Sequence, residues 1–192
     1  MAKQFNFSNR GGMGVHPGTY VKGFDIVMRN LNKEITALKH RSERGLVLAA
    51  ALVRRSTEIK PPLTPVDIGN LRASWFVVSP SGVEADPLGY SGQFSRGPGL
   101  SGKIETRIAE MASNHAKAIS EAQGLVLSSS RRNPFVVMGY SMIYAAAVHE
   151  MMERHPDVTW NREGAGPKWF QAAVYGNRKE IVDIIATKSR IR

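Results

Sequence analysis

The fold turns on residues 64–75, which read Thr64-Pro65-Val66-Asp67-Ile68-Gly69-Asn70-Leu71-Arg72-Ala73-Ser74-Trp75. Thr64 is typical of a helix N-cap, Pro65 suits the first helical position, and Asp67 stands where a capping-box carboxylate reaches back. Gly69 interrupts this pattern, so we expect either one short turn or a helix that begins afresh near Ile68. The aromatic and β-branched run 75–78 then favours a strand.

A helical pattern precedes this corner. Apolar residues recur on a 3.6-residue period over about residues 21–59, at Phe24, Val27, Leu31, Ile35 and Leu38 and again from Leu46 to Val53. We expect one long helix, or two that are separated at Gly45, and a firm stop at Pro61-Pro62. Residues 1–20 are rich in Gly, Asn and Ser and are expected to form a flexible arm.

The second half of the chain mixes loops, helices and strands. The Gly/Pro-rich composition of residues 80–102 predicts a long loop or extended arm. A helix is predicted over residues 103–122. His115 lies on its apolar face, where we expect a core or edge histidine. Residues 125–128 and 134–139 favour strands, 142–152 a short helix, and Pro167 opens a final amphipathic helix. These patterns predict an α+β fold with a small, mostly antiparallel sheet. Residues 21–192 would form a single domain, with the arm and helix inserted at about 80–123.

Charge is concentrated at the two ends of the chain. The net charge is +10, and residues 1–60 hold 11 Lys/Arg against 4 Asp/Glu while residues 161–192 hold 7 against 3. Basic ends point to an acidic partner, either nucleic acid or an acidic protein surface, or else to the solvated faces of two amphipathic helices. The run 39–44 could contact phosphates without reading bases. We therefore keep a basic, non-specific nucleic-acid-binding protein as an alternative.

Patterns that would indicate an enzyme are incomplete. Residues 97–103 match the G-x-x-x-x-G-K part of a phosphate-binding loop, but Ile104 replaces the Ser or Thr that would hold Mg²⁺. His149 and His155 lie six residues apart, whereas a zinc-binding helix needs a spacing of four. We predict no catalytic, cofactor-binding or metal-binding residue. The chain has no cysteine, no apolar run long enough to cross a bilayer and no secretory h-region, so we expect no membrane partner and a reducing compartment.

Three motifs, in order, carry a resemblance to a known family. The corner Pro65-Val66-Asp67-x-Gly69-x-Leu71-Arg72-x-Ser74, the block Tyr144-Ala145-x-x-Val148-His149-Glu150, and the helix start Lys168-Trp169-Phe170-x-Ala172-Ala173 resemble the minor tail-component and neck proteins of tailed bacteriophages. The resemblance covers about residues 20–79 and 124–190. The loop and helix at residues 80–123 are longer than the family's short hairpins, and the family's Glu-x-Gly step is here Glu150-Met151-Met152.

The resemblance implies a structural virion protein of the neck, formed in the host cytoplasm and joining head to tail as a homo-oligomeric ring. Its partners would be other copies of the chain, the adjacent head-completion or connector proteins, the tail-terminator or tail proteins, and passing DNA without sequence preference. A ring needs a rigid body with arms that bridge to neighbours, and residues 1–20 and 80–102 fit such arms.

Eight residues are candidates for structural or interface roles. We expect Trp75 to be buried, Arg72 to pair with a carboxylate or backbone carbonyls, and Glu150 to pair with Lys168 rather than to act with His149 as an acid–base pair. Within the Gly/Pro-rich arm, the side chains suited to anchor a partner are Tyr90, Phe94 and Arg96.

Overall fold

Strand β1 (Trp75–Ser79) is the centre of the folded body, because all five of its residues are buried. It pairs antiparallel with β2 (Gly82–Glu84) on one side and with β3 (Val137–Tyr140) on the other. The prediction of a small antiparallel sheet within an α+β fold is therefore confirmed.

The structure is a computed structural model, and it describes residues 23–95, 104–131, 133–151 and 160–190. The arm predicted for residues 1–20, the whole phosphate-loop-like stretch 97–103, Arg96 and His155 lie outside these residues. The helices are α1 (Phe24–Ile59), α2 (Asn70–Ala73), α3 (Ile104–Ser129), α4 (Ala145–Glu150), α5 (Trp169–Gly176) and α6 (Arg178–Ser189).

The chain divides into two compact units, residues 1–35 and residues 36–192. The described part of the first unit is Gly23 and the beginning of α1, where every residue is exposed. Helix α1 itself is continuous through Gly45 and ends before Pro61-Pro62, so the long-helix expectation is confirmed.

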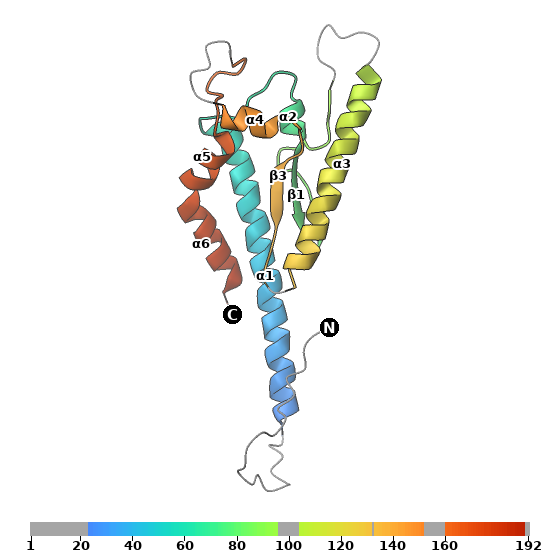
Figure 1. Ribbon diagram of the computed structural model, residues 1–192. Helices are drawn as coiled ribbons and strands as arrows, with labels where there is room; N and C mark the ends of the chain where they lie inside the picture. The colour runs from blue at the N-terminus through green and yellow to red at the C-terminus, as the bar shows by residue number, and fades with distance from the viewer. Residues whose placement is uncertain (1–22, 96–103, 132, 152–159, 191–192) are drawn as a thin grey trace, which may run out of the picture. The chain divides into compact units, whose positions relative to one another are not determined.

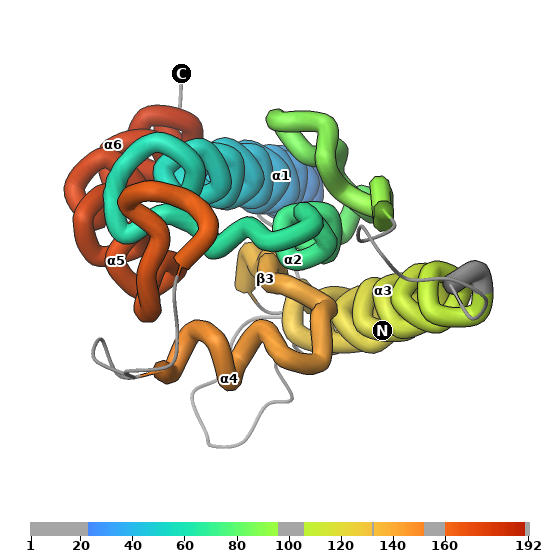
Figure 2. The backbone as a smooth tube through the Cα atoms, turned by 90° about the horizontal axis from the view of Figure 1, so that it is seen from above, coloured from blue at the N-terminus to red at the C-terminus, as the bar shows by residue number. Residues whose placement is uncertain are grey.

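In the second unit, helices cover both faces of the sheet (Figures 1 and 2). Trp75 and Val77 point to the same side and cluster with Ala50 of α1. Phe76 and Val78 point to the opposite side, where Ala122 and Val126 of α3 cover them. Because successive strand residues face opposite sides, a strand that is apolar throughout needs such cover on both faces.

Helices α5 and α6 lie against the other side of α1 (Figures 1 and 2). A Cβ added at Gly45 would lie 3.1 Å from the Cα of Ile185, so a residue without a side chain allows α1 and α6 to approach closely. The prediction of one final helix was wrong, because Asn177 separates α5 from α6. The Asn177 side chain is buried, donates to Ser56 Oγ (2.8 Å) and accepts from Lys60 Nζ (2.8 Å), which ties this junction to α1.

The strand expected at Leu125–Ser128 is instead the last turn of α3. Val126 is 1 % exposed, whereas Leu125 and Leu127 are 57 % and 62 % exposed. Val126 and Ala122 are four residues apart and share the helix face that contacts the sheet. Tertiary packing on a helical period thus outweighs the local strand preference. The second expected strand, 134–139, forms as β3, which begins three residues later and ends one residue later.

At the corner, Thr64 does not cap a helix. Its backbone N–H and its Oγ1 both donate to the carbonyl of Thr57, at 2.8 and 3.2 Å, and so satisfy the end of α1. The chain then turns through Gly69, whose φ of +88° is a left-handed conformation that suits glycine, into the single turn α2. Of the two expectations at the corner, the helix that begins afresh near Ile68 is confirmed, because α2 begins at Asn70, and the helix start predicted at Thr64-Pro65 was wrong.

The Gly/Pro-rich stretch 80–102 is not a loop throughout, because its beginning forms β2. Beyond β2, the Asp86 carboxylate accepts from the N–H groups of Leu88, Tyr90 and Ser91 and holds the turn that follows. This first part of the stretch therefore belongs to the body of the second unit.

Candidate interaction site

A buried ion-pair network lies beneath the corner. Arg54 of α1 is 0 % exposed and donates to Glu58 Oε1 at 2.9 Å and to Asp86 Oδ1 at 3.3 Å. It also donates to the carbonyl of Arg72 at 3.2 Å. Burial alone would lower the pKa of Arg54, but the neighbouring Tyr140, Asp86 and Glu58 outweigh it and raise that pKa. The guanidinium is therefore held charged and joins α1, the corner and the residue 86 turn.

Glu58 connects this network to two further arginines. Arg72 Nη2 lies 2.8 Å and Arg162 Nη1 2.6 Å from Glu58 Oε2. Arg162 also donates to the carbonyls of Glu58 and Thr64. The predicted pairing of Arg72 with a carboxylate is confirmed, and Trp75, at 1 % exposed, is buried as predicted. Such a network fixes the relative positions of the joined segments, which is a structural role.

Tyr90 and Phe94 contact the chain's own body. The Tyr90 ring lies 4.3 Å from Arg72 Cζ, a cation–π contact. Phe94 lies edge-on to His115, with ring centroids 5.5 Å apart. Phe94 is thus half-buried within the chain, and Tyr90, at 38 % exposed, keeps part of its ring accessible.

His115 is a buried core histidine, as its position on the α3 face predicted. Ser91 Oγ donates to the Trp75 carbonyl at 2.7 Å, which leaves its lone pairs to accept from His115 Nε2–H at 3.5 Å. His115 Nδ1 then accepts from Ser141 Oγ at 2.8 Å. Burial lowers the pKa of His115, so the imidazole is neutral near pH 7.

His149, Glu150 and Lys168 meet where α4 ends and α5 begins. Lys168 Nζ donates to Glu150 Oε2, so the predicted pair is confirmed. His149 also contacts this pair: its Nε2 accepts from Gln171 N–H (3.3 Å), and its Nδ1 donates to Glu150 Oε1 (2.7 Å). Both residues lie in the last turn of α4. The hydrogen bonds from Lys168 and His149 lower the pKa of Glu150.

This cluster is largely solvated, since the Glu150 side chain is 60 % exposed. The His149 ring lies edge-on to buried Trp169, with centroids 4.9 Å apart. Lys168 has a φ of 59°, and its N–H donates to the carbonyl of His149 at 2.8 Å. The backbone and the Trp169 contact therefore set the α4–α5 angle more than the exposed ion pair does.

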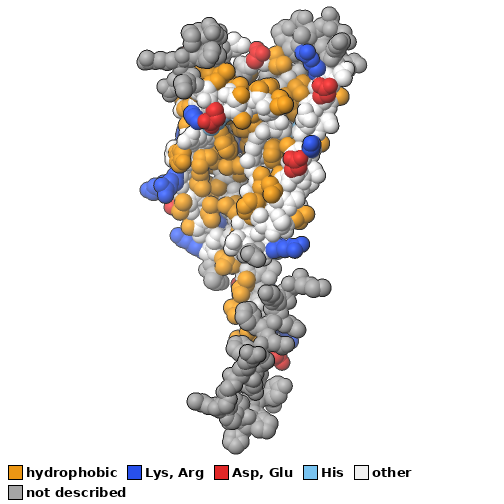
Figure 3. Space-filling model, in the orientation of Figure 1, with side chains coloured by type: hydrophobic (Ala, Val, Ile, Leu, Met, Phe, Trp, Pro, Cys, Tyr) orange, Lys and Arg blue, Asp and Glu red, His pale blue; other side chains and the backbone are white. Residues whose placement is uncertain are grey.

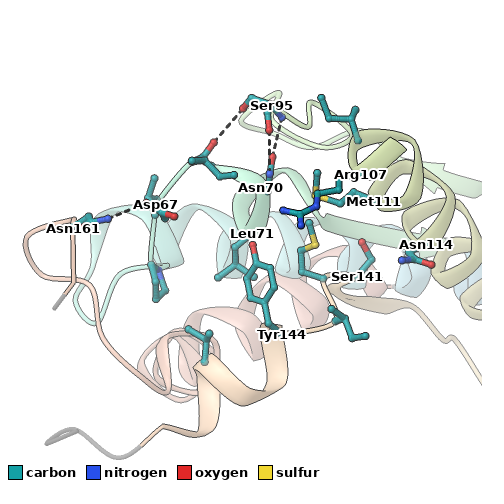
Figure 4. Close-up of a pocket in the computed structure, with 18 of the residues that line it drawn as sticks. Asp67, Asn70, Leu71, Ser95, Arg107, Met111, Asn114, Ser141, Tyr144 and Asn161 are labelled. Atoms are coloured by element: carbon teal, nitrogen blue, oxygen red, sulfur yellow. Dashed lines mark hydrogen bonds between the residues drawn. The ribbon is translucent and has the colours of Figure 1, made fainter. Parts of the chain in front are cut away.

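The described residues form an open groove between the corner, α3 and α4 (Figure 4). Its volume is about 900 Å³ and it lies within the second unit. Figure 3 shows hydrophobic side chains spread over much of one face of this unit. The apolar lining of the groove includes Pro65, Leu71, Ile108, Met111, Met142 and Val148.

Four of the polar residues that line the groove form two pairs. Asn161 Nδ2 donates to Asp67 Oδ1 at 3.0 Å, and Asn70 exchanges two hydrogen bonds with the backbone of Ser95, as Figure 4 shows. Burial and then the Asp67 carboxylate raise the pKa of Tyr144, so its phenol remains protonated. An apolar groove with paired polar edges is suited to bind apolar side chains.

A second apolar surface lies in the first unit. The described residues of α1 before Thr36 include six large apolar side chains that are 40–62 % exposed. Phe24, Val27, Leu31 and Ile35 have the spacing of one helix face. Together these residues form the α1 stripe: Phe24, Val27, Met28, Leu31 and Ile35.

In the part of the chain that the structure describes, no group of three or more His, Cys, Asp or Glu side chains is placed to hold a metal ion. None of the helices described here is long and apolar enough to span a bilayer.

Sequence reasoning did not identify Arg54, Glu58, Asp86 or Arg162, or the groove. The signal present in the sequence was the spacing of Arg54 and Glu58, which places an opposite-charge pair on one helix face. Asp86 and Arg162 carry no local signal, because their partners are distant in the chain.

Comparisons of the chain with family models, curated proteins and solved structures found no match.

Proposed function

We propose that this chain is a structural subunit of the neck of a tailed bacteriophage, where it forms a homo-oligomeric ring that joins head and tail. The α1 stripe carries the proposal: five large apolar side chains on one face of a helix are exposed in the isolated chain. Exposed apolar surfaces of this kind mark protein interfaces. The three sequence motifs at the corner, at α4 and at the start of α5 support the choice of family.

The rest of the structure is consistent with a rigid subunit. The ion-pair network beneath the corner joins α1, the corner, the residue 86 turn and the residue 162 loop. A subunit that transmits position from head to tail needs such fixed joints more than it needs a catalytic centre. Its partners would be other copies of the chain and the adjacent head-completion, connector, tail-terminator or tail proteins.

The decisive experiment measures the copy number of this protein in purified particles by quantitative mass spectrometry. We expect a fixed number that is a multiple of the ring size. Absence of the protein from particles would overturn the proposal.

A matched pair of variants then tests the stripe. Leu31→Glu introduces a charge on the stripe, and Asn30→Glu introduces the same charge away from it on the same helix. We expect Leu31→Glu to abolish incorporation into particles and Asn30→Glu to permit it. Light scattering of the purified protein with and without duplex DNA tests the nucleic-acid alternative. That alternative predicts that the protein forms larger particles only when DNA is present.

A further inference from the structure

Strand β3 is an open edge of the sheet in the part of the chain that the structure describes. The strand order is β2-β1-β3, so β3 has a partner strand on one side. The N–H of Ser141 donates to the carbonyl of Ser74 at 2.9 Å, and backbone groups alternate in direction along a strand. Gly139 therefore hydrogen-bonds toward β1, whereas the N–H and C=O groups of Met138 and Tyr140 point away from it. An extended chain is the partner that such a row of donors and acceptors fits.

This edge lacks the features that protect sheet edges from other chains. Short strands, charged side chains and prolines discourage pairing at an edge. At the opposite edge, β2 is three residues long and carries Glu84. By contrast, residues 133–149, which include β3, contain no Lys, Arg, Asp or Glu in a chain whose net charge is +10. Because β3 itself also has no proline, it is the edge suited to accept a further strand.

The sequence near the N-terminus has the pattern of such a strand. Residues 4–8 read Gln4-Phe5-Asn6-Phe7-Ser8, in which polar and aromatic residues alternate. Alternation with a period of two is typical of a strand with one apolar face. Residues 4–8 lie outside the described residues, which begin at Gly23. The connecting residues 9–22 can span up to about 50 Å when fully extended, which is enough to reach another copy.

The side chains of β3 suit an aromatic neighbour strand. Met138 and Tyr140 are two residues apart and are partly buried against the same cluster on one face of the sheet. Phe5 and Phe7 have the same spacing, so both rings can lie beside these side chains on an adjacent strand. Neither segment carries a charge, so the pairing buries no charged side chain from either strand.

We infer that residues 4–8 of one copy add a strand to the β3 edge of a neighbouring copy. This inference rests on the proposed ring and names one contact between its subunits. Because the donor segment and the acceptor edge are different surfaces, each copy can bind one neighbour through each of them. Such a head-to-tail contact generates rings.

Photo-cross-linking between two isotopic forms of the full-length chain tests the contact. The photoreactive residue p-benzoylphenylalanine replaces Phe5 in unlabelled protein, which is mixed at high concentration with protein labelled with nitrogen-15. A link between an unlabelled and a labelled peptide joins two different copies, and mass spectrometry identifies the residues joined. We expect position 5 to link to residues 136–140 of the labelled copy in several-fold excess over the same probe at Gly14, which lies outside the alternating run.

A matched pair of substitutions tests the face of the added strand. With the probe at position 5, Phe7→Asn removes the second ring from the same face, and Asn6→Ser changes the opposite face. We expect the link to β3 to fall several-fold in the first variant and to persist in the second. Equal yields from the two probe positions, links confined to single copies, or no link between copies at any concentration would overturn the inference. Those results would leave the ring in place, because copy number in particles tests the ring separately.

Discussion

Glu58 and Arg162, which are 104 residues apart in the sequence, lie 2.6 Å apart in the structure. The same carboxylate oxygen of Glu58 also meets Arg72, and its other oxygen meets Arg54. One side chain, 6 % exposed, thus holds three arginines from three segments. Asp86 is the second carboxylate of this network.

Replacement of Glu58 by Gln should strongly destabilise the fold. In the variant, Asp86 is the one carboxylate of the described network that remains near the three guanidinium groups. Removal of one partner from a buried pair costs roughly 3–5 kcal/mol. We expect the free energy of unfolding, measured by urea denaturation with circular dichroism, to fall by about that amount. Glu121→Gln, at an exposed position on α3, is the control and should change it little. A loss below about 1 kcal/mol for Glu58→Gln, as surface pairs give, would contradict the role of the network.

Two glycine substitutions should have opposite effects. Gly45→Leu would place side-chain atoms where Ile185 approaches α1, and overpacking of this kind typically costs about 1–3 kcal/mol. Gly124→Ala on α3 meets no atom within 4 Å, and alanine in a helix is favoured over glycine by roughly 0.5–1 kcal/mol. Thermal unfolding should therefore show a lower Tm for the first variant and a higher Tm for the second. Equal Tm changes would show that α1 and α6 do not approach closely at Gly45.

Stability should decrease as pH falls through the titration of His115. Burial lowers the pKa of His115 below its usual 6.5, so the unfolded chain takes up a proton that the folded chain still excludes. Between the lowered folded pKa and about 6.5, the unfolded state binds more protons than the folded state. The free energy of unfolding therefore decreases as the pH decreases. His115→Gln removes this contribution, so its stability should depend less on pH than that of the unmodified chain. An unchanged pH dependence in His115→Gln would contradict this role of His115.

The Glu150–Lys168 pair should contribute little to stability. Both side chains are substantially exposed, so solvent and salt screen their attraction. Because hydrogen bonds from Lys168 and His149 lower the pKa of Glu150 below 4.5, any contribution is present above that pH and is lost as pH falls through the folded pKa. Glu150→Gln should therefore unfold almost like the unmodified chain at neutral pH, and identically in high salt. A large loss of stability in urea denaturation would show that the pair is protected from solvent.

Several local elements could be predicted because their signals are local. The 3.6-residue period and Pro61-Pro62 set the extent of α1, and the run that begins at Trp75 predicts β1. Trp75 at the corner and His115 on α3 are buried, as their positions predict. In each case the spacing of neighbouring residues carries the information, and such spacing is visible without the fold.

Other features depend on packing between distant segments. Leu125–Ser128 favours a strand locally, yet the sheet stabilises it as helix because Val126 completes the face that contacts Phe76 and Val78. Thr64 satisfies the end of α1 instead of beginning a helix, because the carbonyl of Thr57 is within reach.

The sequence by itself therefore determined the long helix α1, the central strand β1 and the burial of Trp75, since these follow from periodicity and residue preference over a few turns. Only the tertiary structure decided the network of Glu58 with Arg162 and the groove between the corner, α3 and α4. A buried charge must be paired, but its partner can come from any part of the chain, and a groove exists only after several elements have packed together. Neither property is encoded in the spacing of neighbouring residues.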